Sequence, residues 1–218
     1  MTTGTPGAIP FNWHSFSFVH PVNREPTWKA KVPRWSQLDA PAYGLAEAFT
    51  VWRDQLKRPD LILLASPGAS NETDRKFTRT GASSPSLFVH TLPNIRCSPM
   101  LQVMEWSGPV LCVQNDPSTM TRGLIEAAWL VAAGEAPTVW VLSVVQEGDA
   151  HVAHVFEVLS SGYASFELCR EPGEPVVCDD KALADWLNQP MGSLRLGSSH
   201  VAQVSSRTKE RHGRITDQ

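Results

Sequence analysis

Long apolar runs and an excess of basic charge are both missing from this 218-residue sequence. No segment approaches the roughly 18 consecutive apolar residues of a membrane-crossing helix, so we expect no membrane span. The first residues lack the basic and then apolar segments of a secretory signal. The 19 Lys and Arg residues are outnumbered by 22 Asp and Glu residues, for a net charge of −3. Because nucleic-acid-binding proteins usually concentrate basic residues on one face, no nucleic-acid partner is expected.

Cysteine is scarce, and no C-x-x-C motif is present. The four cysteines are Cys97, Cys112, Cys169 and Cys178. Disulfides persist mainly in oxidising compartments, so we expect free thiols in a cytoplasmic protein, with a Cys169–Cys178 bridge as the less favoured alternative. His151 and His154 have the spacing of a helical metal site, but no acidic or cysteine pattern accompanies them. We therefore predict neither a metal nor a cofactor.

A strand, a turn, a helix and a second strand can be recognised between residues 110 and 147. Val110–Val113 is a short apolar run with β-branched residues, typical of a buried strand. Apolar residues then recur at helical spacing from Leu124 to Ala132, and Gly134 is a typical helix stop. Thr138–Val145 is a second apolar run. A strand–helix–strand unit of this kind favours a parallel sheet covered by helices.

The turn before that helix, Asn115–Thr119, is where α/β enzymes often place a nucleophile, because a helix N-terminus stabilises negative charge. The turn contains no cysteine, and its serine does not lie in the G-x-S-x-G motif of a nucleophile elbow. Ser118 and Thr119 are therefore interpreted as helix caps. Asp116 is also interpreted as a cap rather than a base, since the helix terminus favours its charged form.

Motifs around this turn resemble the N-terminal half of the β-ketoacyl synthases of the thiolase-like superfamily. Ser84–Phe88 resembles the S-P-x-x-F that opens the family's central helix, and Asn94 falls in its N-x-x-x-G/S segment. Gly108-Pro109 matches the G-P before the nucleophile strand, and Ala127–Glu135 matches the A-A-x-x-I-x-x-G-D pattern that ends the nucleophile helix. Aligning these motifs places Pro117 where the family has its catalytic cysteine.

The resemblance runs roughly from Phe11 to Val158, and it points to the short ketosynthase-like subunit, or chain length factor, of aryl polyene type II polyketide systems. It implies an α/β fold, a thiolase-like half with a mostly parallel sheet flanked by helices. It implies a non-catalytic subunit, because Pro117 occupies the nucleophile position and the C-terminal half that carries the family's two catalytic histidines is expected to be missing. The implied partner is an active β-ketoacyl-ACP synthase of polyene, fatty acyl or type II polyketide biosynthesis, with an acyl carrier protein as a further candidate.

Candidate residues for an interface or an acyl tunnel follow from the same resemblance. They are Phe88, His90, Asn94, Met100, Met104, Asp116, Pro117 and Ser118. Pro93 and Pro99 predict a kinked or two-piece helix in the stretch from 84 to 106, and its methionines fit the core better than a tunnel. Two alternatives stay open: a stand-alone acyl-transfer or hydrolytic enzyme that uses Ser118 with a nearby histidine, and a homodimeric scaffold.

The predicted β-ketoacyl synthase N-terminal-like domain covers residues 11–190. Residues 1–10 and the tail from 191 to 218 are expected to be disordered. The segment 151–159 fits either a helix or a strand. Residues 164–170 and 176–177 are predicted to pair as a hairpin, and a short helix with Asp179 as its cap is expected to follow.

Overall fold

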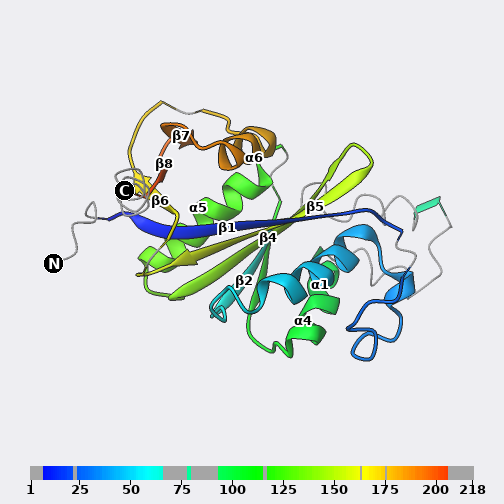
Figure 1. The fold of residues 1–218 in the computed structure, drawn as a ribbon. Coiled ribbons are helices and arrows are strands. Elements are labelled where there is room, and N and C mark those ends of the chain that lie inside the picture. The colour runs from blue at the N-terminus through cyan, green and yellow to red at the C-terminus, as the bar shows by residue number, and fades with distance from the viewer. Residues whose placement is uncertain are drawn as a thin grey trace, which may run out of the picture.

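A computed structural model describes residues 7–21, 24–65, 78–79, 93–114, 117–162, 164–174 and 176–205. They form one eight-stranded sheet with helices on both faces (Figure 1). The strands are β1 (Ile9–Phe18), β2 (Leu61–Ala65), β3 (Val110–Val113), β4 (Thr138–Glu147), β5 (Ala150–Leu159), β6 (Phe166–Arg170), β7 (Ser193–Leu196) and β8 (His200–Val204). The helices are α1 (Ala40–Trp52), α4 (Ser98–Met104), α5 (Thr119–Ala132) and α6 (Asp180–Asn188), with short 3-10 helices η1 (Trp35–Gln37) and η2 (Pro93–Cys97).

The strand order is β3-β2-β4-β5-β1-β6-β8-β7. β2 runs parallel to both β3 and β4, as the strand–helix–strand pattern predicts. The other neighbouring pairs are antiparallel, so the prediction of a mostly parallel sheet is wrong. The physical reason lies in the centre of the sheet. There β4 and β5 form a hairpin whose turn contains Gly148 at a φ of +61°, and β1 inserts antiparallel between β5 and β6.

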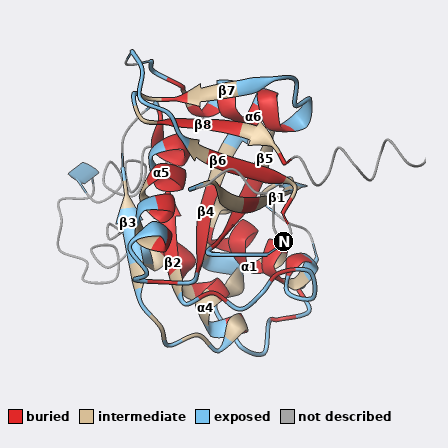
Figure 2. Cartoon of the chain, turned by 90° about the vertical axis from the view of Figure 1, so that its left-hand side faces the viewer, coloured by how far each residue is buried: buried red, intermediate tan, exposed pale blue. Residues whose placement is uncertain are grey.

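α5 and α6 cover one face of the sheet, and α1 and α4 cover the other (Figure 1). Side chains of β4 alternate between these faces. Val139 and Val141 belong to the core beneath α5, whereas Trp140 and Leu142 belong to the core beneath α1. Figure 2 shows the buried residues concentrated in the central strands and on the helices that cover them. The predicted α/β arrangement, a sheet flanked by helices, is therefore confirmed.

Gly123 lets α5 approach the sheet closely. A Cβ atom at this position would lie 2.9 Å from the Cβ of Ala65 and 2.9 Å from Cγ1 of Val141. Separations this short do not occur between carbon atoms in packed proteins, so any side chain at residue 123 would push α5 away from β2 and β4. Gly123 therefore sets the height of α5, and of the turn before it, above the sheet.

The ordered chain extends past both predicted boundaries of the domain. β7 and β8 lie beyond residue 190, so the prediction of a disordered tail is wrong as far as residue 205. These strands are ordered because they bury apolar side chains, among them Leu196, Val201 and Ala202. At the other end, β1 begins at Ile9, inside the segment expected to be disordered. Residues 1–6 and 206–218 lie outside the described residues.

Several local predictions can now be compared with the structure. Residues 151–159 are a strand, so His151 and His154 point to opposite faces of the sheet and cannot share a metal. The hairpin prediction is wrong, because β6 pairs with β8 while Val176 and Val177 are exposed. α6 begins as predicted with Asp179 as its cap, whose Oδ1 accepts a 2.7 Å hydrogen bond from the backbone N–H of Ala182.

The remaining sequence expectations concern thiols, proline kinks and membranes. All four cysteines are free thiols, which excludes the Cys169–Cys178 bridge. The described part of the stretch from 84 to 106 is in two pieces, η2 followed by α4, as its prolines predict. Within the described ranges, no helix has the length and apolar character needed to cross a membrane.

Candidate functional site

The site to which the sequence points lies at the N-terminus of α5. β3 is the edge strand of the sheet, and it leads into the turn before α5. Pro117 is exposed in this turn, and Ser118 immediately precedes the helix. Asp116 lies outside the described residues. Pro117 thus lies at a strand-to-helix turn, the kind of position at which α/β enzymes present a nucleophile.

The first N–H groups of α5 are held by a residue from a distant part of the chain. Oδ1 of Asp180 accepts hydrogen bonds from the backbone N–H of Met120, at 2.7 Å, and of Thr121, at 3.3 Å. The backbone N–H of Asp180 in turn donates to the carbonyl oxygen of Pro117 at 3.0 Å. Ser118 stands at the N-cap position of α5, as predicted, but its side chain makes no capping hydrogen bond. The cap of α5 is a buried carboxylate from α6.

A pocket of about 310 Å³ opens beside this cap. Its lining residues come from the start of α5, the loop before α6 and the β7–β8 turn, and we call it the α5 pocket: Pro117, Ser118, Thr121, Arg122, Ile125, Val176, Val177, Cys178 and Gly197. No histidine belongs to this lining among the described residues. Ser118 is buried, and the described lining of its pocket provides no histidine base of the kind that the hydrolytic alternative requires.

Cys178 is the thiol of the α5 pocket, and sequence analysis did not connect it with this site. It is 4% exposed. Burial raises the pKa of the Cys178 thiol, and the neighbouring Asp179 and Asp180 carboxylates raise it further, although a hydrogen bond with Thr121 acts in the opposite direction. Because the thiolate is the reactive form, Cys178 is a weak nucleophile.

A serine–histidine pair does occur, but in the β7–β8 turn. Ser199 Oγ and His200 Nδ1 lie 2.8 Å apart. His200 packs edge-on against Trp129, whose ring lies 5.0 Å from the guanidinium carbon of Arg170. Burial, together with the charge of Arg170, lowers the pKa of His200 and makes it a weaker base. Neither Ser199 nor His200 lines the α5 pocket.

A second concave surface, the edge groove, runs between β3 and the outer side of α5. It encloses about 610 Å³ and is lined by Leu63, Leu111, Cys112, Val113, Gln114, Arg122, Glu126 and Leu130. Leu111 is 45% exposed on the edge strand, and the sequence of β3, Val-Leu-Cys-Val, contains no charge. The opposite edge strand, β7, contains Arg195, which is bonded to Glu171. Proteins usually protect exposed edge strands with charges, and among the described residues β3 is an edge strand without a charged side chain of its own.

The remaining predicted residues do not gather at the α5 pocket. Phe88 and His90 lie outside the described residues. Met100 is fully buried and Met104 is half-buried in the core beneath α1, on the other face of the sheet from α5, so their interpretation as core residues is confirmed. Asn94 is exposed, and its carbonyl oxygen accepts a hydrogen bond from the thiol of Cys97. Burial raises the pKa of that thiol to about 12.

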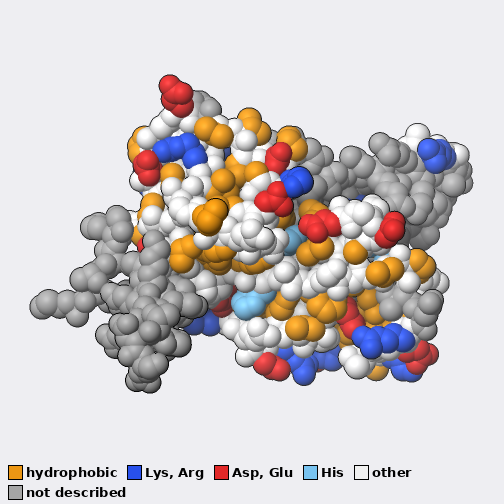
Figure 3. All heavy atoms as spheres, turned by 45° about the horizontal axis from the view of Figure 1, so that its top comes forward, with side chains coloured by type: hydrophobic (Ala, Val, Ile, Leu, Met, Phe, Trp, Pro, Cys, Tyr) orange, Lys and Arg blue, Asp and Glu red, His pale blue; other side chains and the backbone are white. Residues whose placement is uncertain are grey.

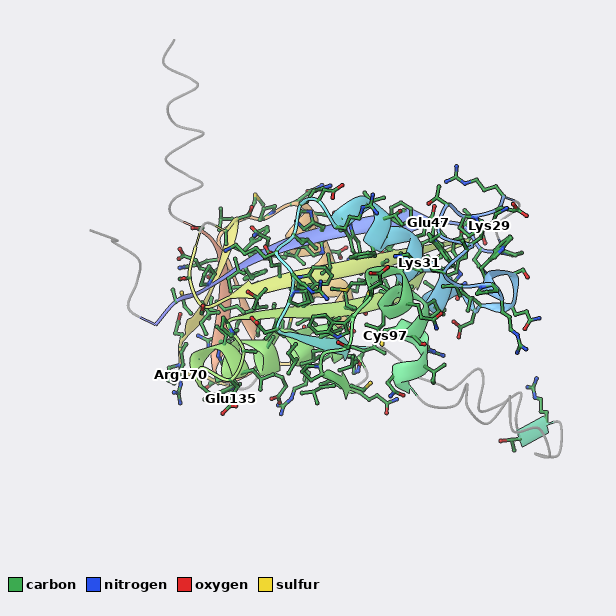
Figure 4. The ribbon with its side chains drawn as sticks, turned by 90° about the horizontal axis from the view of Figure 1, so that it is seen from below. Lys29, Lys31, Glu47, Cys97, Glu135 and Arg170 are labelled. Atoms are coloured by element: carbon green, nitrogen blue, oxygen red, sulfur yellow. The ribbon has the colours of Figure 1, made fainter. Side chains whose placement is uncertain are left out.

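Charged side chains elsewhere are bonded locally. Lys31 pairs with Glu105 at 2.7 Å, and Glu47 accepts a 2.8 Å hydrogen bond from the indole of Trp28. Figure 4 places Lys31 and Glu47 at one end of the molecule and Arg170 at the other. On the face drawn in Figure 3, acidic and basic side chains are interspersed.

No protein-family model matches the sequence, and no match is found among curated proteins. Among solved structures, a chain from "Ketosynthase (ApeO) in Complex with its Chain Length Factor (ApeC)" of Xenorhabdus doucetiae has a TM-score of 0.62 and 14% identity, covering 90% of this chain and 99% of that one. The oxazolomycin ketosynthase domain OzmH KS8 of Streptomyces albus JA3453 has a TM-score of 0.41 and 12% identity, covering 70% of this chain and 44% of that one. A 3-oxoacyl-(acyl-carrier-protein) synthase III has a TM-score of 0.42 and 16% identity, covering 75% and 55%. The first of these likenesses shows that this chain shares the α/β fold of a chain from that complex, in agreement with the fold that the sequence resemblance implies.

Proposed function

We propose that this chain is a non-catalytic, ketosynthase-like subunit of the chain length factor type. It pairs with an active β-ketoacyl-ACP synthase in polyene, fatty acyl or type II polyketide biosynthesis, with aryl polyene systems as the specific expectation. The observation that carries the proposal is the N-terminus of α5. There Pro117 stands at the position assigned to the nucleophile, and Asp180 already holds the first N–H groups of the helix.

The chemistry of condensation explains why this arrangement favours a non-catalytic role. The reaction needs a thiolate to carry the acyl chain, basic groups for decarboxylation and N–H groups to stabilise an oxyanion. Proline provides neither a nucleophile nor an N–H group. Cys178 is the nearby thiol, and its raised pKa keeps it protonated. A subunit of this kind contributes by binding and stabilising its partner rather than by reacting.

The length of the related chain supports the same proposal. Nine-tenths of this chain superposes on nearly the whole of a chain from the ApeO–ApeC complex. That complex contains a ketosynthase and its chain length factor. A ketosynthase partner, and an acyl carrier protein that serves the pair, are therefore the partners we propose. The four free thiols fit the reducing cytoplasm, where we place the complex.

The edge groove is the surface we assign to the synthase. Within the described residues, β3 has a neighbouring strand on one side only, so its other side can pair with a strand from another chain, and the apolar side chains beside it add area to be buried. Leu111 on β3 is an exposed residue of this surface. Pairing at β3 would bring the partner next to the turn that contains Pro117, because that turn directly follows the strand.

Co-expression with the ketosynthase encoded nearest to this chain tests the proposal. We expect the two proteins to co-purify as a one-to-one complex, and the chain alone to take up no acyl group from an acyl carrier protein. Acylation and condensation by the purified chain would instead favour the stand-alone enzyme. A stable homodimer that ignores the ketosynthase would favour the scaffold.

A further inference from the structure

We propose that Asp180 prevents acyl-chain condensation in a second way, independent of Pro117. Its carboxylate accepts hydrogen bonds from the N–H groups of α5 that would otherwise stabilise a thiolate. This inference rests on the proposed function, because it concerns the position that the resemblance assigns to the nucleophile. It adds that replacing Pro117 by cysteine would not by itself restore an activated thiol.

Asp180 is held at the α5 N-terminus by hydrogen bonds of both its side chain and its backbone. The residue is 9% exposed, and its Oδ1 lies 2.7 Å from the backbone nitrogen of Met120 and 3.3 Å from that of Thr121. Its own backbone N–H is bonded to the carbonyl oxygen of Pro117, inside the same turn.

Asp180 is also held from the other side by α6. It is the first residue of that helix, whose cap is Asp179 and whose apolar side chains Leu183 and Leu187 are buried in the core. The packing of α6 therefore holds the backbone of Asp180 next to the α5 terminus.

The hydrogen bonds of Asp180 affect the pKa of any cysteine placed at residue 117. A helix N-terminus is equivalent to roughly half a positive charge, which normally lowers the pKa of a cysteine placed there. The Asp180 carboxylate already accepts from these N–H groups, and in its ionised form it opposes a second anion beside it. A thiolate at residue 117 would therefore lose the stabilisation that this position gives in an active enzyme.

The test compares the thiol introduced by Pro117→Cys with and without Asp180→Asn. The asparagine side chain keeps an oxygen that can accept from Met120 and Thr121 but removes the charge. The rate of iodoacetamide alkylation is measured for the introduced thiol alone, by mass spectrometry of its peptide, because the native Cys112 is also exposed. Asp179→Asn is the matched control, since this neighbouring carboxylate caps α6 rather than α5 and its hydrogen bond is exposed to solvent.

We expect Asp180→Asn to accelerate alkylation at neutral pH about threefold, because lowering a thiol pKa by one unit raises the thiolate about tenfold while its nucleophilicity falls about threefold. Asp179→Asn should leave the rate nearly unchanged, because solvent screens its charge. An unchanged rate in Asp180→Asn, or equal acceleration in the control, would overturn the proposal. If Asp180→Asn does not fold, Asp180→Ser supplies a neutral capping oxygen for the same comparison. No partner is needed, so the result does not depend on whether the chain binds a synthase.

Discussion

The carboxylate of Asp180 accepts a 2.7 Å hydrogen bond from the backbone N–H of Met120, although the two residues are 60 positions apart in the sequence. Through this bond α6 caps α5, and the adjacent Asp179 caps α6 itself. Two consecutive carboxylates thus begin two different helices. The contact joins the strand–helix–strand unit to the C-terminal part of the chain, beside Pro117, the residue that the sequence resemblance aligns with a catalytic cysteine.

Replacing Asp180 by alanine should destabilise the protein by about 2 kcal/mol, because two buried N–H groups lose their acceptor. Urea unfolding measures the loss. Asp179→Ala removes an exposed cap and should cost about 1 kcal/mol or less. An Asp180→Ala variant as stable as the Asp179→Ala variant would show that the cross-helix cap contributes little.

Gly123→Ala should destabilise the protein by about 1–2 kcal/mol, although alanine is the better helix former by about 1 kcal/mol. The added methyl group would lie 2.9 Å from Ala65 and Val141, so α5 must shift away from the sheet. The control is Ala132→Gly at an exposed position of the same helix, which changes propensity without a clash and should cost about 1 kcal/mol. A stabilising effect of Gly123→Ala in thermal unfolding would contradict the close approach.

Acidification should destabilise the protein through His154. Burial lowers the pKa of His154 from 6.5 to about 4, and its Nδ1 accepts a 3.3 Å hydrogen bond from the indole of Trp13. Between these two pKa values the unfolded chain binds a proton that the folded protein excludes. The contribution of neutral His154 to the free energy of unfolding is therefore complete above the unfolded pKa of 6.5. It falls by about 3 kcal/mol as the pH drops toward 4.

The measurement is urea unfolding across this pH range for the wild type and for His154→Leu. Other histidines titrate in the same window, so the difference between the two proteins isolates residue 154. The variant should lose less stability on acidification. Parallel curves for the two proteins would show that His154 does not cause the loss.

Cys112 should report whether a partner covers β3. Its thiol is exposed on the edge strand, so a maleimide should label it in the isolated chain at alkaline pH. We expect labelling to slow at least about tenfold when the synthase is bound, while Cys169 on β6 keeps its rate. Mild oxidation distinguishes the homodimeric alternative, because self-pairing of β3 would bring two copies of Cys112 within reach of each other. Labelling at an equal rate with and without the synthase would place the interface elsewhere.

The sequence predicted those helices and strands whose signals lie within a single short segment. Val110–Val113, α5 and β4 follow from apolar spacing and from a glycine stop, because these signals lie within one segment. Strand direction could not be predicted in the same way, since β1 is placed between β5 and β6 by residues more than 130 positions away. β7 and β8 were not predicted because each strand has only four or five residues and polar residues lie among them. Asp180 was missed because an acidic residue in the first turn of α6 is ordinary, and only the fold brings it to α5.

The most direct test of the account is the mass of the complex formed with the ketosynthase, measured by light scattering after size exclusion. Leu111→Lys is compared with Val51→Lys, which changes a residue of similar exposure (45% and 48%) on α1, which covers the other face of the sheet. We predict a one-to-one complex for the wild type and for Val51→Lys, and separate subunits for Leu111→Lys. An intact complex with Leu111→Lys, or no complex with the wild type, would contradict the role proposed for this chain and for its exposed edge.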